Sequence, residues 1–228
     1  MTRVKIEKML SFFFVVILHP TTFITFYKYK RFTMIPFRTY VLNLILCARF
    51  KNIKGSIVEC GVWRGGMSAG MVSVFGKNRE YYLFDSFEGL PAAKEVDGAS
   101  AIDWQNNKTS NSYFDNCKAE ESFAETCMKN SGAKNVHLVK GWFSETLPTA
   151  KINESIAILR LDGDWYESTM DCMTNLYPQV IKGGLIILDD YNVWDGCARA
   201  THDYLSQNNL DVRIYQFKDS TIHFIIKK

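Results

Sequence analysis

Two apolar segments in the second half of the chain each end in a pair of acids. The pairs are Asp162 with Asp164, separated by one glycine, and Asp189 with Asp190. If the segments are neighbouring strands, the four carboxylates meet at one sheet edge, where they repel each other and raise each other's pKa. Mg²⁺ relieves such repulsion, because it binds carboxylate oxygens and retains several waters. The simpler alternative is that the four acids bind no metal and are solvated residues at the ends of the strands.

A metal at this edge would serve to activate a hydroxyl group. A bound divalent cation lowers the pKa of a substrate hydroxyl and orients it, and a neighbouring carboxylate can take the proton. Asp162 is therefore predicted as a metal ligand, and Asp164 as the general base or as an acid that supports the ligands. The sequence has no cluster of histidines and cysteines with zinc-like spacing, which favours magnesium.

A glycine-rich segment, VECGVWRGG, predicts where a cofactor binds. Gly61 and Gly65 let the backbone turn tightly and approach a ligand after a strand. The segment lacks the G-x-G-x-x-G pattern of dinucleotide sites, and Glu59 would repel a pyrophosphate. Asp85, at the end of the next predicted strand, is placed to accept hydrogen bonds from ribose hydroxyls. S-adenosylmethionine fits, because it carries a sulfonium and an ammonium but no phosphate.

These cofactor features also have a purely structural alternative, in which the glycines only pack a helix and Asp85 only caps one. Trp142 and Phe143 likewise either flank an adenine ring or pack in the core. The combination of all these features in this strand order favours a ligand. The predicted cofactor residues are Glu59, Gly61, Arg64, Gly65, Asp85, Ser86, Gly141 and Trp142.

Strand-like segments that alternate with helix-like segments must position these residues. The alternation predicts a doubly wound α/β fold, with a parallel sheet covered on both faces. Two further strands, 211–217 and 220–228, predict a closing antiparallel hairpin, so that the sheet is mixed. The five parallel strands are predicted at residues 55–61, 80–87, 135–143, 155–163 and 183–191.

Other segments are predicted to complete the fold. Apolar residues at helical spacing predict a helix at 33–50, and a second helix is predicted at about 116–130. Residues 91–115 are polar and are predicted as a long loop, and such loops often act as lids. Trp165 and Tyr191 flank the acids and either stack on a sugar or pack against their neighbours.

The composition is that of a globular domain with a small appendage. Of the 228 residues, 47% are hydrophobic and 22% are charged, and the net charge of +3 gives no support to a nucleic-acid partner. The six cysteines form no C-x-x-C pair. They are predicted to be reduced thiols, which indicates a reducing compartment such as the cytoplasm.

The N-terminus has a basic start followed by the apolar residues 9–18. This run is too short to span a bilayer as a helix. Three interpretations stay open: a docking or oligomer helix, contact with a membrane surface, or a targeting segment. Residues 1–32 are therefore assigned to an N-terminal helical segment, and residues 33–228 to the cofactor-binding domain.

Six segments together resemble the macrocin O-methyltransferase (TylF-type) family. They are VECGVWRGG, LFDSFEGLP, VKGWFSETLP, LRLDGDWYESTMDCMTNLYPQV, GGLIILDDY and CARATHDY, and they cover about residues 33–210 in that order. The resemblance implies a class I methyltransferase fold, with a Rossmann-like seven-stranded sheet. It also implies that S-adenosylmethionine and Mg²⁺ are used to methylate a sugar hydroxyl, typically on a glycosylated natural product.

The same resemblance implies roles for individual residues. Asp162, Asp189 and Asp190 are then the metal ligands, Asp164 is the base, and Asp85 binds the ribose. Because the N-terminal region of this family helps to form the lid and the subunit interface, a homo-oligomer, most simply a dimer, is expected. The acceptor stays open, since a polysaccharide or a lipid-linked sugar fits as well as an antibiotic.

Two other functions compete with a methyltransferase. An NAD-dependent oxidoreductase is disfavoured by the missing glycine fingerprint and by the Asp189-Asp190 pair. A non-catalytic, membrane-associated protein with the same fold is disfavoured by the four clustered acids, for which a scaffold has no use.

Overall fold

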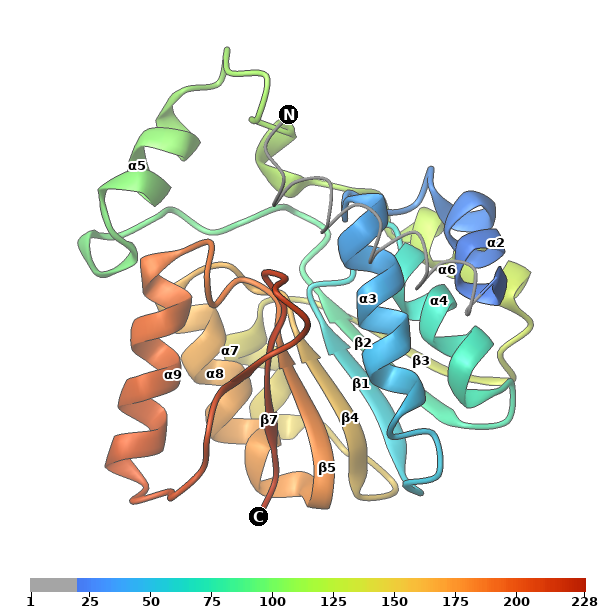
Figure 1. Ribbon diagram of the computed structural model, residues 1–228. Coiled ribbons are helices and arrows are strands. Elements are labelled where there is room, and N and C mark those ends of the chain that lie inside the picture. The colour runs from blue at the N-terminus through green and yellow to red at the C-terminus, as the bar shows by residue number, and fades with distance from the viewer. Residues whose placement is uncertain (1–19) are drawn as a thin grey trace, which may run out of the picture.

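The computed structural model describes residues 20–228. Within them, seven strands form one sheet in the order β3-β2-β1-β4-β5-β7-β6 (Figure 1). The first five strands are parallel, and β7 pairs antiparallel with β5 and β6, so the predicted mixed sheet is confirmed. The strands are β1 (Ser56–Cys60), β2 (Glu80–Asp85), β3 (Asn135–Lys140), β4 (Ile156–Leu161), β5 (Val180–Leu188), β6 (Tyr215–Gln216) and β7 (His223–Ile226).

Helices cover both faces of the sheet. One layer holds α2, α3, α4 and α6, and the other holds α7, α8 and α9, each over its own apolar core (Figure 1). The helices are α2 (Pro20–Tyr29), α3 (Phe37–Ala48), α4 (Gly66–Phe75), α5 (Ala99–Asn106), α6 (Glu121–Ser131), α7 (Phe143–Thr146), α8 (Tyr166–Leu176) and α9 (Asp195–Gln207). Short 3₁₀ helices lie at Glu95–Asp97, Asp115–Cys117, Leu147–Thr149 and Tyr177–Gln179.

The strand order reverses between β1 and β4, which is where doubly wound sheets bind their ligands. The segments that leave these two strands lie against each other. Gly61 has a φ of +87°, and a Cβ atom there would lie 1.8 Å from the carbonyl oxygen of Asp162. Only glycine therefore lets the glycine-rich loop and the acidic segment lie side by side.

Residues 91–115 are not the structureless loop that their polarity predicted. They contain α5, which stands above the carboxyl ends of the strands (Figure 1). The ring of Trp104 on α5 packs edge-on against Trp194, and the Gln105 amide donates to the carbonyl of Pro91. Contacts of an aromatic ring and of a side-chain amide thus dock a polar segment, an effect that composition does not reveal.

Three other predicted elements are shorter in the structure. The helix predicted at 33–50 is α3, which begins after Pro36. The helix predicted at about 116–130 is α6, which begins later because residues 115–117 have positive φ angles that a right-handed α-helix does not accommodate. The first strand of the hairpin is reduced to the two residues of β6.

Residues 9–18 lie outside the described part of the chain, so the predictions made for them are not tested. The helix that follows them, α2, packs on α3 through Phe26 and Phe37, whose ring centroids are 5.0 Å apart. None of the helices within residues 20–228 has the length and apolar character needed to cross a bilayer. All six cysteines are free thiols.

Candidate active site

A cavity of about 690 Å³ opens at the carboxyl ends of the strands, within the size range of small-molecule sites. Its walls come from the ends of β1, β2, β4 and β5, from α5, and from the segment before α3. Residues of both predicted groups line it: Gly61, Asp85, Ser86 and Trp142 from the cofactor group, and Asp162, Asp164, Asp189 and Asp190 from the acids. The two groups therefore share one cavity.

Three of the four acids form a compact group. One oxygen from each of Asp162, Asp164 and Asp190 lies within 4.8 Å of the others. Asp164 has a left-handed backbone with a φ of 58°, and its N–H donates to Oδ2 of Asp190 over 3.1 Å. Burial and the charge of Asp162 raise the pKa of Asp164 to about 8. Burial and the charge of Asp164 raise the pKa of Asp190 in turn.

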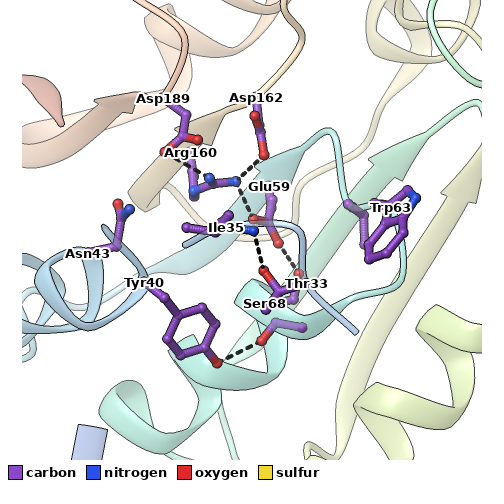
Figure 2. A network of polar contacts seen from close by, with 12 residues as sticks. Thr33, Ile35, Tyr40, Asn43, Glu59, Trp63, Ser68, Arg160, Asp162 and Asp189 are labelled. Carbon is purple, nitrogen blue, oxygen red and sulfur yellow. Dashed lines mark hydrogen bonds and ion pairs between the residues drawn. The ribbon is translucent and has the colours of Figure 1, made fainter. Parts of the chain in front are cut away.

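The fourth acid, Asp189, pairs with a buried cation that the sequence analysis did not single out. Figure 2 shows the guanidinium of Arg160 between three acids. It lies 2.8 Å from Asp189 Oδ1, 2.8 Å from Asp162 Oδ2 and 2.8 Å from Glu59 Oε1. No part of the Arg160 side chain is exposed. This one cation therefore ties together the ends of β1, β4 and β5.

Glu59 faces the core and is not among the residues that line the cavity. Besides Arg160, its carboxylate contacts the hydroxyl of Ser68 on α4, which donates to it (Figure 2). Burial raises the pKa of Glu59 to about 7, although the guanidinium opposes this shift. The structure thus places Glu59 beneath the glycine-rich loop, as a support, rather than against a cofactor.

Asp85 organises the glycine-rich loop and also reaches the cavity. Its Oδ2 accepts the N–H groups of Val62 and Trp63 over 2.7 and 2.8 Å, and its Oδ1 accepts that of Phe87 over 2.7 Å. Asp85 therefore holds the backbone of the loop, but it does not cap α4, whose N-cap is Gly65 without a side-chain cap hydrogen bond. Because its side chain lines the cavity, the residue is also within reach of a ligand there.

The other predicted cofactor residues do not line the cavity. Arg64 lies between two rings, with its guanidinium carbon 4.4 Å from the centroid of Trp63 and 4.6 Å from that of Phe123. Gly65 is the N-cap of α4, with a φ of +83°. Gly141 follows β3, where its N–H donates to the carbonyl of Asp85. These three residues shape the surrounding loops.

Three tryptophans form a cluster beside the acids, with ring centroids 5.2 to 6.3 Å apart. Trp165 is buried and donates its indole N–H to the carbonyl of Pro91, so packing is its role. Trp104 and Trp194 line the cavity instead, and Tyr191 does not. The sequence analysis did not single out Trp104 or Trp194, because one lies in a polar segment and the other in a turn.

The described residues that line the cavity are acidic or uncharged. Seven are Asp or Glu, and none is Lys, Arg or His. Such walls disfavour a phosphate and favour a cation. The donor set of carboxylate oxygens fits a hard ion such as Mg²⁺, and the acidic wall also fits a sulfonium.

Comparison with known proteins identifies the family of this chain. The family described as Macrocin-O-methyltransferase (TylF) matches residues 33–225. The chain belongs to this family. The fold agrees, since the structure of the O-methyltransferase NovP superimposes with a TM-score of 0.69 at 30% sequence identity. That likeness covers 84% of this chain and 81% of NovP.

Two proteins named as O-methyltransferases are similar in sequence. The demethyldecarbamoylnovobiocin O-methyltransferase of Streptomyces niveus is 38% identical over 159 residues, which cover 67% of this chain and 59% of that protein. The mycinamicin III 3''-O-methyltransferase of Micromonospora griseorubida is 32% identical over 182 residues, 76% of this chain and 69% of that protein. The chain thus matches less than two thirds of the Streptomyces protein.

Proposed function

We propose that the protein transfers the methyl group of S-adenosylmethionine to a hydroxyl group of a sugar, with Mg²⁺ bound at the acids. One observation carries this proposal: the glycine-rich loop with Asp85 and the acids Asp162, Asp164 and Asp190 line a single cavity. The names of the two relatives support it, since both act as O-methyltransferases on natural products.

The cofactor end of the cavity is assigned to the loop after β1. Gly61 permits close approach of the ligand, Asp85 accepts hydrogen bonds from the ribose, and Trp142 lies against the adenine ring. These roles follow the positions of the residues at the ends of β1, β2 and β3. The absence of a cationic side chain among the described lining residues favours a cofactor without phosphates.

The metal is assigned to Asp162, Asp189 and Asp190. Arg160 already holds one oxygen of Asp162 and one of Asp189, and Asn43 also hydrogen-bonds Asp189. Asp162 and Asp190 are therefore the more available ligands, and Asp189 is the least available of the three. Mg²⁺ bound there would orient the acceptor hydroxyl and lower its pKa.

The chemical step needs a base and a linear arrangement of the acceptor oxygen, the methyl carbon and the sulfur. Asp164 takes the hydroxyl proton as the oxygen attacks the methyl carbon, and the carbon–sulfur bond breaks to leave S-adenosylhomocysteine. A carboxyl whose pKa lies near neutrality is well suited to accept and later release a proton. The cavity walls supply the alignment of oxygen, methyl carbon and sulfur.

The acceptor end of the cavity favours a sugar without phosphate on an apolar carrier. Its lining includes the rings of Trp104 and Trp194 and the apolar side chains of Met34, Ile35 and Val193. Aromatic rings pack well against the apolar faces of sugars and ring systems. A nucleotide sugar would instead bring its diphosphate to acidic walls.

The proposal extends to a dimer in a reducing, cytoplasmic environment. The exposed apolar side chains of Phe23, Ile24 and Tyr27 on α2 support a second copy as the partner of the N-terminal region. The six free cysteines support the compartment. Sedimentation equilibrium tests the dimer, and flotation with vesicles tests the alternative of a membrane surface.

Calorimetric titration with S-adenosylhomocysteine tests the cofactor class, with NADH as the control ligand and with Mg²⁺ present or absent. Binding of S-adenosylhomocysteine but not of NADH is expected. No binding of S-adenosylhomocysteine in either buffer would overturn the methyltransferase proposal, whereas binding of NADH would favour the oxidoreductase alternative.

A further inference from the structure

Trp194 lies in the turn between β5 and α9 and contacts two acids of the cavity. Its backbone N–H donates to the carbonyl of Asp190 over 2.9 Å, and its indole N–H donates to Oδ1 of Asp164 over 2.7 Å. The N–H of Asp164 in turn donates to Oδ2 of Asp190 over 3.1 Å. These three hydrogen bonds close a ring through Asp164, Asp190 and Trp194.

The ring fixes the Asp164 carboxylate relative to Asp190. The backbone of Asp164 is held from one side by Asp190, and its side chain is held from the other side by the indole. Oδ1 is therefore engaged, and the second oxygen remains to accept a proton. The left-handed backbone of Asp164 has a cost for a non-glycine residue, and the two hydrogen bonds offset it.

The indole itself is held in place by its neighbours. Its ring packs edge-on against Trp165, at 5.2 Å between centroids, and against Trp104 of α5, at 5.9 Å. The direction of the N–H is therefore set by packing, before any substrate binds. The same ring lines the cavity, so it joins the segment above the site to the proposed base.

The geometry points to Trp194 as a positioning residue: its indole N–H holds one oxygen of Asp164, so that the other oxygen faces the acceptor hydroxyl. This inference rests on the proposed function, in which Asp164 is the base. Trp194 then has two separate roles: its indole N–H positions Asp164 for the chemical step, and its ring contacts the acceptor.

The substitution Trp194→Phe tests this role, because it keeps an aromatic ring and removes only the donor. We expect the kcat of methyl transfer to fall about tenfold or more, as for loss of a hydrogen bond to a charged group. The KM for S-adenosylmethionine should stay unchanged. The matched control is Tyr81→Phe, which removes a buried aromatic donor bonded to a backbone carbonyl outside the cavity, and which should leave kcat within about twofold.

A double-mutant cycle with Asp164→Asn separates positioning from general structural damage. If Trp194 acts through Asp164, then Trp194→Phe should slow single-turnover methyl transfer in the natural background but not in the Asp164→Asn background. An equal loss in both backgrounds would overturn the inference.

A spectroscopic readout completes the test without any reaction. The chain has five tryptophans, so protein labelled with ¹⁵N at the indoles gives five N–H signals, of which Trp194→Phe identifies one. Asp164→Asn should shift that signal and speed its hydrogen exchange, and should leave the Trp165 signal in place. A signal that does not respond would contradict the hydrogen bond. If Asp164→Asn shifts the signal but transfers methyl groups at the natural rate, the hydrogen bond holds and the assignment of Asp164 as the base fails instead.

Discussion

The acids at the ends of β4 and β5 fall into two regions that balance their charge differently. In the first region, Asp162 and Asp189 each give one oxygen to the fully buried Arg160. In the second region, Asp164 and Asp190 make no ion pair with a cation of the described chain, and the side-chain partner of Asp164 is an indole N–H. We refer to these as the arginine-paired and the indole-paired acids. The second name is taken from Asp164, since the carboxylate of Asp190 accepts the backbone N–H of Asp164 instead.

The difference shows which acids the fold has neutralised. A buried carboxylate without a cation costs free energy, so it persists where function requires it. The arginine-paired acids are fixed by a cation that the chain itself provides. The indole-paired acids have no cation of the described chain to balance their charge, and their raised pKa values mean that they retain protons when no metal ion is bound.

The largest effect is expected at the indole-paired acid Asp164. The substitution Asp164→Asn keeps the shape and tolerates the left-handed backbone, but it cannot take a proton. We expect kcat to fall by about a hundredfold to ten-thousandfold, with unchanged calorimetric affinity for S-adenosylhomocysteine. A loss of cofactor affinity similar to the loss of rate would show that Asp164 acts in binding.

The next largest effect is expected from removing the cation of the arginine-paired acids. Arg160→Met leaves Glu59, Asp162 and Asp189 around an uncharged side chain, which should lower the free energy of unfolding by about 3–5 kcal/mol. Urea unfolding measures the change, with the exposed Arg199→Met as the matched control. A loss under about 1 kcal/mol would mean that Arg160 does not balance these acids.

A smaller difference should separate the neighbours Asp189 and Asp190. Because Arg160 already shares the charge of Asp189, Asp190→Asn should weaken Mg²⁺ binding more than Asp189→Asn does, by about tenfold. Titration of the two variants with Mg²⁺ or Mn²⁺ measures both affinities side by side. Equal losses would remove the distinction between the two kinds of acid.

The smallest effect is expected in how far Mg²⁺ raises the Tm at different pH values. The pKa of Asp164 rises from 3.8 to about 8 on folding, so the metal-free folded protein keeps a proton that the unfolded chain releases. Its stability should therefore fall as the pH rises from about 4 to 8. If Mg²⁺ binds at these acids as proposed, it should relieve this loss and raise the Tm by about 5 °C at pH 8.5.

At pH 6 the ion must displace protons, so the rise in Tm should be less than half as large. Scanning calorimetry at both pH values, with NaCl at matched ionic strength as the control, measures the difference. A rise that is larger at pH 6 would contradict the assignment of the indole-paired acids.

The sequence was informative where local pattern decides structure. Apolar runs that end in acids revealed β4, β5 and the carboxylates, because strand ends and charge are both visible along the chain. Arg160 was visible only as a break in an apolar run, since its partner Glu59 lies 101 positions away. The role of Trp194 likewise depends on a hydrogen bond across 30 positions, which no local spacing encodes.

At the cofactor end of the cavity, too, the sequence reveals local features but not long-range contacts. The loop glycines and Asp85 were found because turns and strand ends have local signatures. Glu59 and Arg64 belong to the same short motif, yet the fold turns one toward Arg160 and the other between two aromatic rings. Which side of a loop a side chain takes is decided by tertiary packing.

The most direct test of the account is a crystal structure with Mn²⁺ in place of Mg²⁺ and with S-adenosylhomocysteine bound. The anomalous signal of manganese locates the ion without assumption. The account predicts one peak within bonding distance of Asp162 and Asp190, beside the bound nucleoside, with Arg160 still paired to Asp189. A nucleoside bound in this cavity with no manganese peak at the acids would contradict it.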